Sequence, residues 1–329
     1  MLYDGDFLTG IENGLRQALP LWDVAPGTQL QLLTISENAT FKASQTGTGG
    51  DLVFRVHRPD YHTRAEIESE LAWIEALRAA GDIRTPRPIP LRDGSHIADL
   101  NHDGSIRHVV AFEFLPGREP AESDDLAGWF HKLGAIHAGL HTQARAWARP
   151  AGFTRKIWAY HTTLGATPLW GDWRAGLGLT KDGRAILERT AQVLERELAA
   201  IGTSDDTFGL IHADLRLANL LVDGDALALI DFDDCGFSWF LYDFAAAISF
   251  LEHEPYVPAL MEAWIAGYRT RAPLSQAQAE QLPVFIMLRR MLLTAWVASH
   301  AETPTAQSMG VPYTQGTVAL AQAFLAARA

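Results

Sequence analysis

The first third of the chain alternates short apolar runs with turns, which is typical of a small antiparallel sheet. Apolar, β-prone segments occupy residues 30–35, 40–43 and 52–56, and Pro59 ends the last of these. A further apolar run covers residues 108–115. We therefore expect these segments to be the strands of one sheet.

One helix is expected between the run that Pro59 ends and the run that follows it. Thr63 can cap its start, Glu66 follows at the spacing of a capping box, and Gly81 is suited to end it. The apolar residues between these ends recur at helical spacing: Ile67, Leu71, Ile74 and Leu77. This stripe predicts a helix that packs one face against the sheet.

After the run at residues 108–115 the spacing becomes mostly helical. Apolar residues recur at helical intervals over residues 126–140, and residues 282–297 form a long apolar stretch. Two short strands are expected around residues 219–231. The sequence thus predicts an α+β fold, with a small N-terminal lobe of an antiparallel sheet plus a helix and a larger, mainly helical C-terminal lobe. We place these lobes at residues 1–115 and 116–329.

Composition and charge narrow the class of protein. Of the 329 residues, 48% are hydrophobic and 20% are charged, as in an ordinary folded protein. The formal net charge is -12, which argues against nucleic acid as a partner, because nucleic-acid binding needs a basic surface. Since Cys235 is the single cysteine, no internal disulfide is expected.

The sequence also argues against a membrane segment. The N-terminal residues lack the basic and apolar regions of a signal peptide. The apolar stretch at residues 282–297 is shorter than the about 20 residues that a membrane span needs, and Arg289 and Arg290 interrupt it. We therefore expect a buried helix at this stretch, no membrane partner and a cytoplasmic protein.

The segment between residues 212 and 243 carries the candidate chemistry. Asp223-Gly224-Asp225 lies between two apolar runs, which predicts a hairpin. Pairing of its strands would bring Asn219 and Asp231 together at the open end, and Asp214 lies on the loop that enters the same end. Carboxylate and carboxamide oxygens are ligands that Mg²⁺ prefers. The alternative is that these are ordinary polar residues of loops and caps.

This segment resembles the catalytic signature of the aminoglycoside phosphotransferase and choline kinase superfamily, whose fold is the two-lobe, protein-kinase-like fold. The resemblance is carried by two motifs, His212-x-Asp214-x-x-x-x-Asn219 and Ile230-Asp231-Phe232. The Asp-Phe-Asp-Asp run that begins at Asp231, and the His-Arg-Pro after the third apolar run, are similar to the bacterial stress-response kinase and homoserine-kinase-like branches. At motif level the resemblance covers residues 30–255.

The resemblance implies a role for each residue of the motif. Asp214 would be the catalytic residue that accepts or orients the proton of the acceptor hydroxyl, with ATP as phosphoryl donor. Asn219 and Asp231 would bind Mg²⁺. Asp243 matches the family aspartate that braces the catalytic loop, and His212 would support that loop structurally.

On the nucleotide side, the resemblance implies a cation on the third strand and a carboxylate partner on the following helix. Arg55 takes the position where the family usually has lysine, and Arg58 is a second candidate. Glu70 matches the partner position best. It lies beside the apolar stripe, where a buried charge needs a partner, and the alternative is that it reaches solvent.

Two further segments match nucleotide contacts of the family. Ser36 and Asn38 fall in the turn that would cover the phosphates. The backbone at Glu113 and Phe114 corresponds to the segment between the lobes and would face adenine, and without the resemblance the alternative is a simple edge strand. All four residues are therefore expected to contact the nucleotide.

The sequence signals for the acceptor site are less specific than those for the nucleotide site. Asp233 and Asp234 follow the predicted metal ligand, and could shape the acceptor pocket or help a second metal ion. His137 and His141 are one helical turn apart, which permits metal binding in principle. Because no third ligand is evident, we expect core histidines instead.

Together these features predict ATP- and Mg²⁺-dependent transfer of the γ-phosphoryl group to a hydroxyl group. The expected acceptor is a small molecule, such as an amino alcohol, a sugar or an aminoglycoside-like compound. A second hypothesis is a Ser/Thr protein kinase of the stress-response type. A third is a nucleotide-binding regulatory pseudokinase, which Arg55 in place of lysine favours and the intact Asp214 argues against. A metal-dependent hydrolase would leave Arg55 and Glu70 unexplained.

Overall fold

The computed structural model describes residues 5–35, 38–44, 50–121 and 123–328. Contacts divide the chain into two compact units, each assembled from several stretches of sequence. Unit 1 comprises Met1–Arg118, Ala148–Arg155 and Asp223–Asp233. Unit 2 comprises Glu119–Trp147, Lys156–Val222 and Asp234–Ala329.

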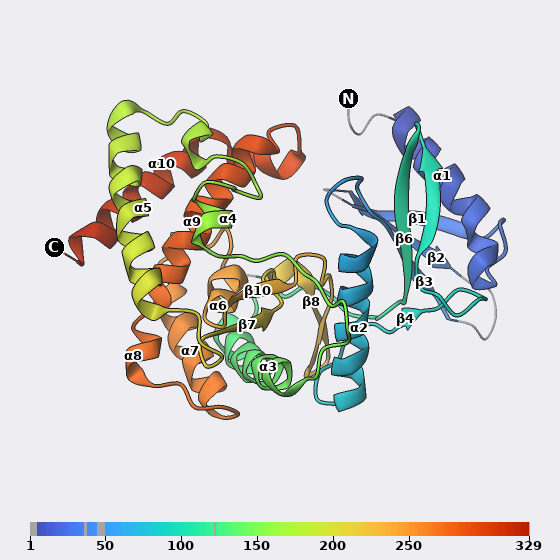
Figure 1. The fold of residues 1–329 in the computed structure, drawn as a ribbon, viewed down its shortest axis with the longest axis horizontal. Coiled ribbons are helices and arrows are strands. Elements are labelled where there is room, and N and C mark those ends of the chain that lie inside the picture. Colours follow the sequence, from blue (N-terminus) through green and yellow to red (C-terminus); the bar gives the residue numbers. More distant parts are fainter. Residues whose placement is uncertain (1–4, 36–37, 45–49, 122, 329) are drawn as a thin grey trace. The chain divides into compact units, whose positions relative to one another are not determined.

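Unit 1 is built on a six-stranded antiparallel sheet (Figure 1). Its strands are β1 (Gln29–Ile35), β2 (Ala39–Ser44), β3 (Leu52–Val56), β4 (Pro88–Ile89), β5 (Ala98–His102) and β6 (Ser105–Glu113). They are paired in the order β1-β2-β3-β6-β4, and β5 pairs with β6. The other elements of the unit are α1 (Gly5–Ala18), the 3₁₀ helix η1 (Leu19–Trp22), α2 (Arg64–Ala80) and β9 (Ala226–Leu229).

Local sequence signals account for most of unit 1. Thr63 and Glu66 form the predicted capping box at the start of α2, and Gly81 ends the helix in the left-handed conformation with φ 81°. The predicted strands are confirmed, although β6 begins at Ser105 and ends at Glu113, not at residues 108 and 115. Its extension at the start follows from pairing with β5, which the pattern did not predict.

Helix α1 was also absent from the sequence expectations. Ile11 and Leu15 on this helix are fully buried in a hydrophobic cluster with sheet residues, including Phe54 and Val109. Alternation along β3 directs Phe54 to this cluster and Arg55 to the opposite face of the sheet. The core therefore fixes the direction in which Arg55 points.

Unit 2 is mainly helical. Its helices are α3 (Leu126–Ala146), α4 (Tyr160–Thr163), α5 (Lys181–Ile201), α6 (Tyr242–Ala247), α7 (Val257–Arg269), α8 (Gln276–Ala279), α9 (Leu282–Ser299) and α10 (Pro304–Ala326). It also contains the 3₁₀ helices η2 (Trp173–Ala175) and η3 (Leu217–Asn219) and the strands β7 (Phe208–Ile211), β8 (Leu220–Asp223) and β10 (Gly236–Trp239). β7 pairs with β10, whereas β8 and β9 form the hairpin that Asp-Gly predicted.

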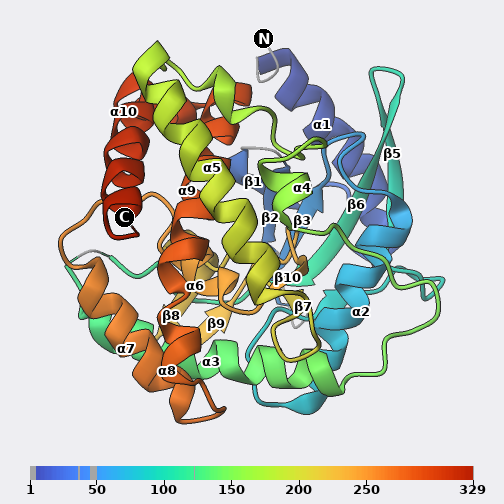
Figure 2. The ribbon, with the colours of Figure 1, turned by 60° about the vertical axis from the view of Figure 1, so that its left-hand side comes forward.

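Helix α9 lies in the core of unit 2, where it contacts α5, α6, α10 and η2 (Figure 2). It is the apolar stretch that the sequence predicted to be a buried helix. By length and composition the segment Gln276–Ser299 could cross a membrane, but 78% of its apolar window is buried inside the protein. Packing thus explains its apolar character.

Helices α3 and α7 pack more closely than ordinary helices because each presents a glycine at the contact. A Cβ added at Gly134 would lie 2.1 Å from the carbonyl oxygen of Trp264, and one at Gly267 would lie 1.8 Å from that of His131. This contact holds His137 and His141 of α3 in the buried interior of the unit.

Candidate active site

Arg55 and Glu70 form a buried ion pair in unit 1. The guanidinium Nη2 of Arg55 lies 2.7 Å from each carboxylate oxygen of Glu70. The two side chains are 6% and 0% exposed, so neither group has water as an alternative partner. The predicted ion pair is present and Glu70 does not reach solvent, while the role of the pair in nucleotide binding stays a prediction.

Two carboxylates of the Asp-Phe-Asp-Asp run also face Arg55, and they differ in exposure. Nη1 of Arg55 lies 3.4 Å from Oδ1 of Asp231 and 3.7 Å from Oδ1 of Asp233. The side chain of Asp231 is 46% exposed and its backbone is left-handed, with φ 60°. The side chain of Asp233 is only 8% exposed. Of the two, Asp231 is the one that a cation in solution can reach.

Asp233 is surrounded by donors. Nδ2 of Asn38 donates to its Oδ2 at 2.9 Å, and Arg155 donates to its backbone carbonyl. The rings of His57 and His62 lie 3.4 and 3.6 Å away. Burial would raise the pKa of the Asp233 carboxyl, but Arg55 and His62 hold it well below its usual range. The Asp233 carboxylate is thus held by protein cations and donors within unit 1, and the roles expected for it at the acceptor pocket or a second metal ion stay predictions.

The sequence did not indicate His57, His62 or Arg155 as part of this cluster. Burial and the neighbouring Arg55 lower the pKa of His57 well below its usual value. Burial also opposes the charged form of His62, but the neighbouring carboxylates of Asp233 and Glu66 raise its pKa. Only His57 had a visible signal in the sequence, the His-Arg-Pro that follows β3.

In unit 2 the loop after β7 carries Asp214, and Asp243 of α6 holds that loop. Oδ1 of Asp243 accepts a hydrogen bond from the backbone N–H of Ala213 at 2.7 Å, and Oδ2 accepts one from that of His212 at 3.4 Å. Ala213 has the left-handed φ of 66°, which a non-glycine residue adopts only when its surroundings hold it there. This geometry is the bracing contact that the resemblance implied for Asp243.

Asp243 is fully buried against two histidines of α3. Nε2 of His141 lies 3.0 Å and that of His137 3.9 Å from its Oδ2. Burial would raise the pKa of the Asp243 carboxyl, but the neighbouring His137 and His141 hold it at about 2. Burial lowers the pKa of both imidazoles, that of His137 to about 3. The predicted core histidines thus support Asp243, which in turn holds the loop that carries Asp214.

The Asp214 carboxylate accepts hydrogen bonds on both oxygens. Nδ2 of Asn219 donates to Oδ2 at 2.8 Å and to the backbone carbonyl of Asp214 at 2.7 Å. Nη2 of Arg289 donates to Oδ1 at 2.6 Å, and Nε of Arg216 lies 3.5 Å from Oδ2. The carboxylate is therefore oriented on both sides. Arg289 was noted in the sequence only as an interruption of an apolar stretch.

The predicted Mg²⁺ ligands are oxygen donors of suitable chemistry. Asn219 uses its Nδ2 for Asp214, so its carboxamide oxygen faces away from that contact as an acceptor. Asp231 supplies a half-exposed carboxylate. The two residues belong to different units, so their convergence stays a prediction. Within the described part of the chain, no three His, Cys, Asp or Glu side chains cluster as a metal site.

The other predicted nucleotide contacts lie in unit 1. The backbone N–H of Glu113 donates to the carbonyl of Arg87 at 2.9 Å, and that of Phe114 to the carbonyl of Asp51 at 3.0 Å. A contact with adenine would thus have to use other groups of this segment. Asn38 accepts from the N–H of Arg58 at 3.0 Å, whereas Ser36 lies outside the described residues.

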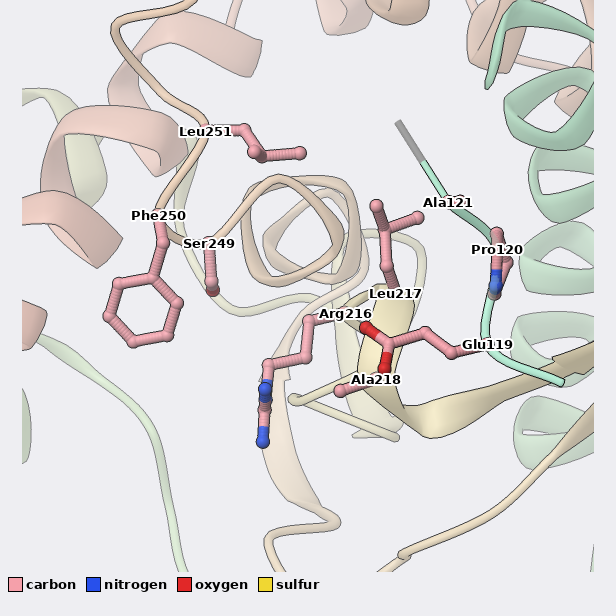
Figure 3. Close-up of a pocket in the computed structure, with 9 residues that line it drawn as sticks. All are labelled: Glu119, Pro120, Ala121, Arg216, Leu217, Ala218, Ser249, Phe250 and Leu251. Carbon is pink, nitrogen blue, oxygen red and sulfur yellow. The ribbon is translucent and has the colours of Figure 1, made fainter. Parts of the chain in front are cut away.

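A pocket of about 420 Å³ opens beside the loop that carries Asp214 in unit 2. Three segments surround it: residues 119–121, residues 216–218 and residues 249–251 (Figure 3). Arg216 and Glu119 bring charged groups to the pocket, and Leu217, Phe250 and Leu251 bring apolar ones. Because Arg216 also contacts Asp214, the pocket adjoins the predicted catalytic carboxylate.

The sequence matches the model of a known protein family. The model described as "Phosphotransferase enzyme family" matches residues 31–276, which is most of the chain. This range contains the Arg55–Glu70 pair and the whole segment from His212 to Asp243.

Comparison with individual proteins gives relatives that cover at least 80% of this chain. A solved structure of a microcompartment-associated aminopropanol kinase is 43% identical, with a TM-score of 0.88, covering 95% of this chain and 97% of that one. The amicoumacin kinase of Bacillus subtilis is 27% identical over 80% of this chain and 78% of its own. A solved complex of the amicoumacin kinase hAmiN with AMP-PNP, Ca²⁺ and Ami is 22% identical, with a TM-score of 0.77. The match covers 96% of this chain and 93% of that one. The kinase-like fold predicted from the sequence is thereby confirmed.

Proposed function

The chain belongs to the phosphotransferase enzyme family and is a kinase with an alcohol group as acceptor, and from this premise we propose that it transfers the γ-phosphoryl group of ATP to a small amino alcohol, with Mg²⁺ as cofactor. The amino alcohol is favoured because the aminopropanol kinase shares 43% identity along nearly the whole chain. We infer further that unit 1 binds the nucleotide and unit 2 the acceptor.

One observation carries the proposal: the Asp214 carboxylate is held from both sides next to a pocket of about 420 Å³. That volume is within the range of about 300 to 1,000 Å³ typical of small-molecule sites. We propose that the acceptor occupies this pocket. A pocket of this volume accommodates a small acceptor, which favours a small molecule over the protein substrate of a Ser/Thr kinase.

Each group then has a defined task. Asp214 orients the acceptor hydroxyl and takes its proton as the acceptor oxygen bonds to the γ-phosphorus of ATP, while the bond from that phosphorus to the β,γ-bridging oxygen breaks and ADP leaves. Arg55, fixed by Glu70, neutralises charge on the ATP phosphates. Mg²⁺ on Asn219 and Asp231 would supply further charge neutralisation on the phosphates. Arg55 keeps the ion pair with the helix carboxylate that a lysine would make, so its presence agrees with an active kinase as well as with a pseudokinase.

The test is an assay of ADP release with ATP and Mg²⁺ over a panel of acceptors. The panel contains 1-amino-2-propanol, ethanolamine, choline, homoserine, 1,2-propanediol and a generic protein substrate. We expect turnover with an amino alcohol and a phosphomonoester product in the ³¹P spectrum. Turnover with the protein substrate alone would refute the small-molecule assignment.

Asp214→Asn is the matched variant because it keeps the shape of the side chain. We expect its kcat to fall by about 10² to 10⁴-fold, the usual contribution of a general base. ATP with Mg²⁺ should still raise its melting temperature, because binding to the folded state alone stabilises it. Unchanged kcat in this variant would remove Asp214 from the mechanism.

A further inference from the structure

Helix α9 brings two adjacent arginines, Arg289 and Arg290, into the core of unit 2, and the side chain of each is only 2% exposed. A buried guanidinium must be paired to be tolerated. Arg290 is paired away from the catalytic loop, with Glu252 at 2.8 Å and with Thr317 and the Tyr313 carbonyl at 2.9 and 3.0 Å. Arg289 is paired with the loop itself.

The donors of Arg289 connect three parts of the candidate site. Nη2 donates to Oδ1 of Asp214 at 2.6 Å, and Nη1 lies 3.4 Å from the carbonyl of Ala213. Nε donates to Oγ of Ser249 at 3.0 Å, and Ser249 lines the pocket. One rigid planar group thus contacts both the predicted base and the pocket wall.

Aromatic side chains hold the guanidinium in place. Its carbon lies 5.1 Å from the ring centre of Trp170 and 5.8 Å from that of Tyr242. Nη1 also lies 3.3 Å from the Tyr242 hydroxyl. Burial would lower the pKa of Arg289, but Tyr242 and Asp214 raise it, so the group stays charged. Its position is therefore set by the core before any substrate arrives.

We propose that Arg289 is a positioning residue of the kinase, which fixes the plane of the Asp214 carboxylate relative to the acceptor pocket; this inference rests on the proposed function. Arg289 holds Oδ1 while Asn219 holds Oδ2, so the carboxylate cannot rotate about its Cβ–Cγ bond without losing a hydrogen bond. The oxygen that receives the acceptor hydroxyl is thereby preorganised. Arg289 itself is too buried to bind the substrate.

Arg289→Lys and Arg290→Lys form a matched pair for the test. Each substitution removes a buried guanidinium group from one of two neighbouring positions of α9. Only Arg289 contacts Asp214. A misplacement of about 1 Å can reduce the rate about 100-fold. For Arg289→Lys we therefore expect a kcat about 100-fold below wild type with KM for the amino alcohol within about 3-fold. For Arg290→Lys we expect a lowered melting temperature with kcat within about 3-fold of wild type.

Chemical rescue gives a second measurement that a purely structural role would not produce. In Arg289→Ala, guanidinium at low millimolar concentration should restore part of kcat, and it should restore none in Arg290→Ala. Equal kcat losses in the two lysine variants, or a loss for Arg289→Lys confined to KM, would overturn the positioning role.

These experiments distinguish a failure of the positioning role of Arg289 from a failure of the proposed acceptor. If wild type turns over an amino alcohol and Arg289→Lys behaves like Arg290→Lys, the positioning role fails alone. If wild type phosphorylates no amino alcohol, the proposed acceptor fails, and Arg289 is then tested on ATP hydrolysis with water as acceptor. There the Arg289→Lys variant should again be slower than Arg290→Lys. Absence of both reactions in the wild type would overturn both proposals.

Discussion

His137 should make the protein sensitive to mild acid, and His137→Asn should relieve part of that sensitivity. The imidazole is fully buried on α3, where Nδ1 accepts a hydrogen bond from Nε1 of Trp264 at 2.8 Å. Asparagine can offer Trp264 an acceptor near the same place, but it does not titrate. Asp243, His141 and His212 are the other titratable groups that act on His137.

The magnitude follows from the change in pKa on folding. Burial lowers the pKa of His137 from 6.5 to about 3. Because the pKa of His137 is lower in the folded state, its contribution to the free energy of unfolding is fully present above pH 6.5 and is lost as the pH falls toward 3. As the pH falls from 7 to 5, the His137 imidazole becomes almost fully protonated in the unfolded chain but stays neutral in the folded protein. This linkage removes about 2 kcal/mol from the free energy of unfolding.

The assay is urea unfolding of wild type and His137→Asn at pH 7, 6 and 5, followed by circular dichroism and tryptophan fluorescence. Any cost of the substitution that does not depend on pH cancels in the comparison. The variant should lose about 2 kcal/mol less than the wild type between pH 7 and pH 5. Equal losses in both proteins, with equal denaturant slopes, would refute the reasoning, because His137 would then not be a buried neutral group.

Two further substitutions test the packing of each unit. Glu70→Gln leaves Arg55 buried with only the more distant Asp231 and Asp233 carboxylates, so we expect a loss of about 3 kcal/mol in urea unfolding and a higher KM for ATP; an unchanged free energy of unfolding would contradict the buried pair. Gly267→Ala places a Cβ 1.8 Å from the His131 carbonyl oxygen and should destabilise unit 2 by about 3 kcal/mol. Gly27→Ala is its control, because the added Cβ meets nothing within 4 Å and should change stability by less than about 0.5 kcal/mol. Equal effects of the two glycine substitutions would show that the α3–α7 contact tolerates a methyl group.

Elements with a strong local signal were predictable. The capping box of Thr63 and Glu66 and the terminating Gly81 gave α2 to within a residue at either end. The Asp-Gly dipeptide gave the hairpin of β8 and β9. Helix α1 and strand β5 were missed because each depends on a partner: Ile11 and Leu15 are buried only when the sheet is present, and β5 is defined by its pairing with β6.

The candidate site divides in the same way. The residue types and spacing of Asp214, Asn219 and Asp231 indicated a phosphotransferase, which the family match confirms, since a family motif is local in sequence. The side chains that hold Asp214 and Asp243 in place could not be inferred from the sequence. Arg289 is 75 positions from Asp214 in the sequence, and His141 is 102 positions from Asp243.

The sequence by itself determined the family and the strands and helices with strong periodicity, and it predicted which residues take part in phosphoryl transfer. These follow from interactions between near neighbours, which a linear pattern records. The tertiary structure alone decided which charged groups meet: Glu70 with Arg55, Asp243 with His141, and Asp214 with Arg289. A buried charge is stable only beside a partner, and packing, not proximity along the chain, decides which partner it has.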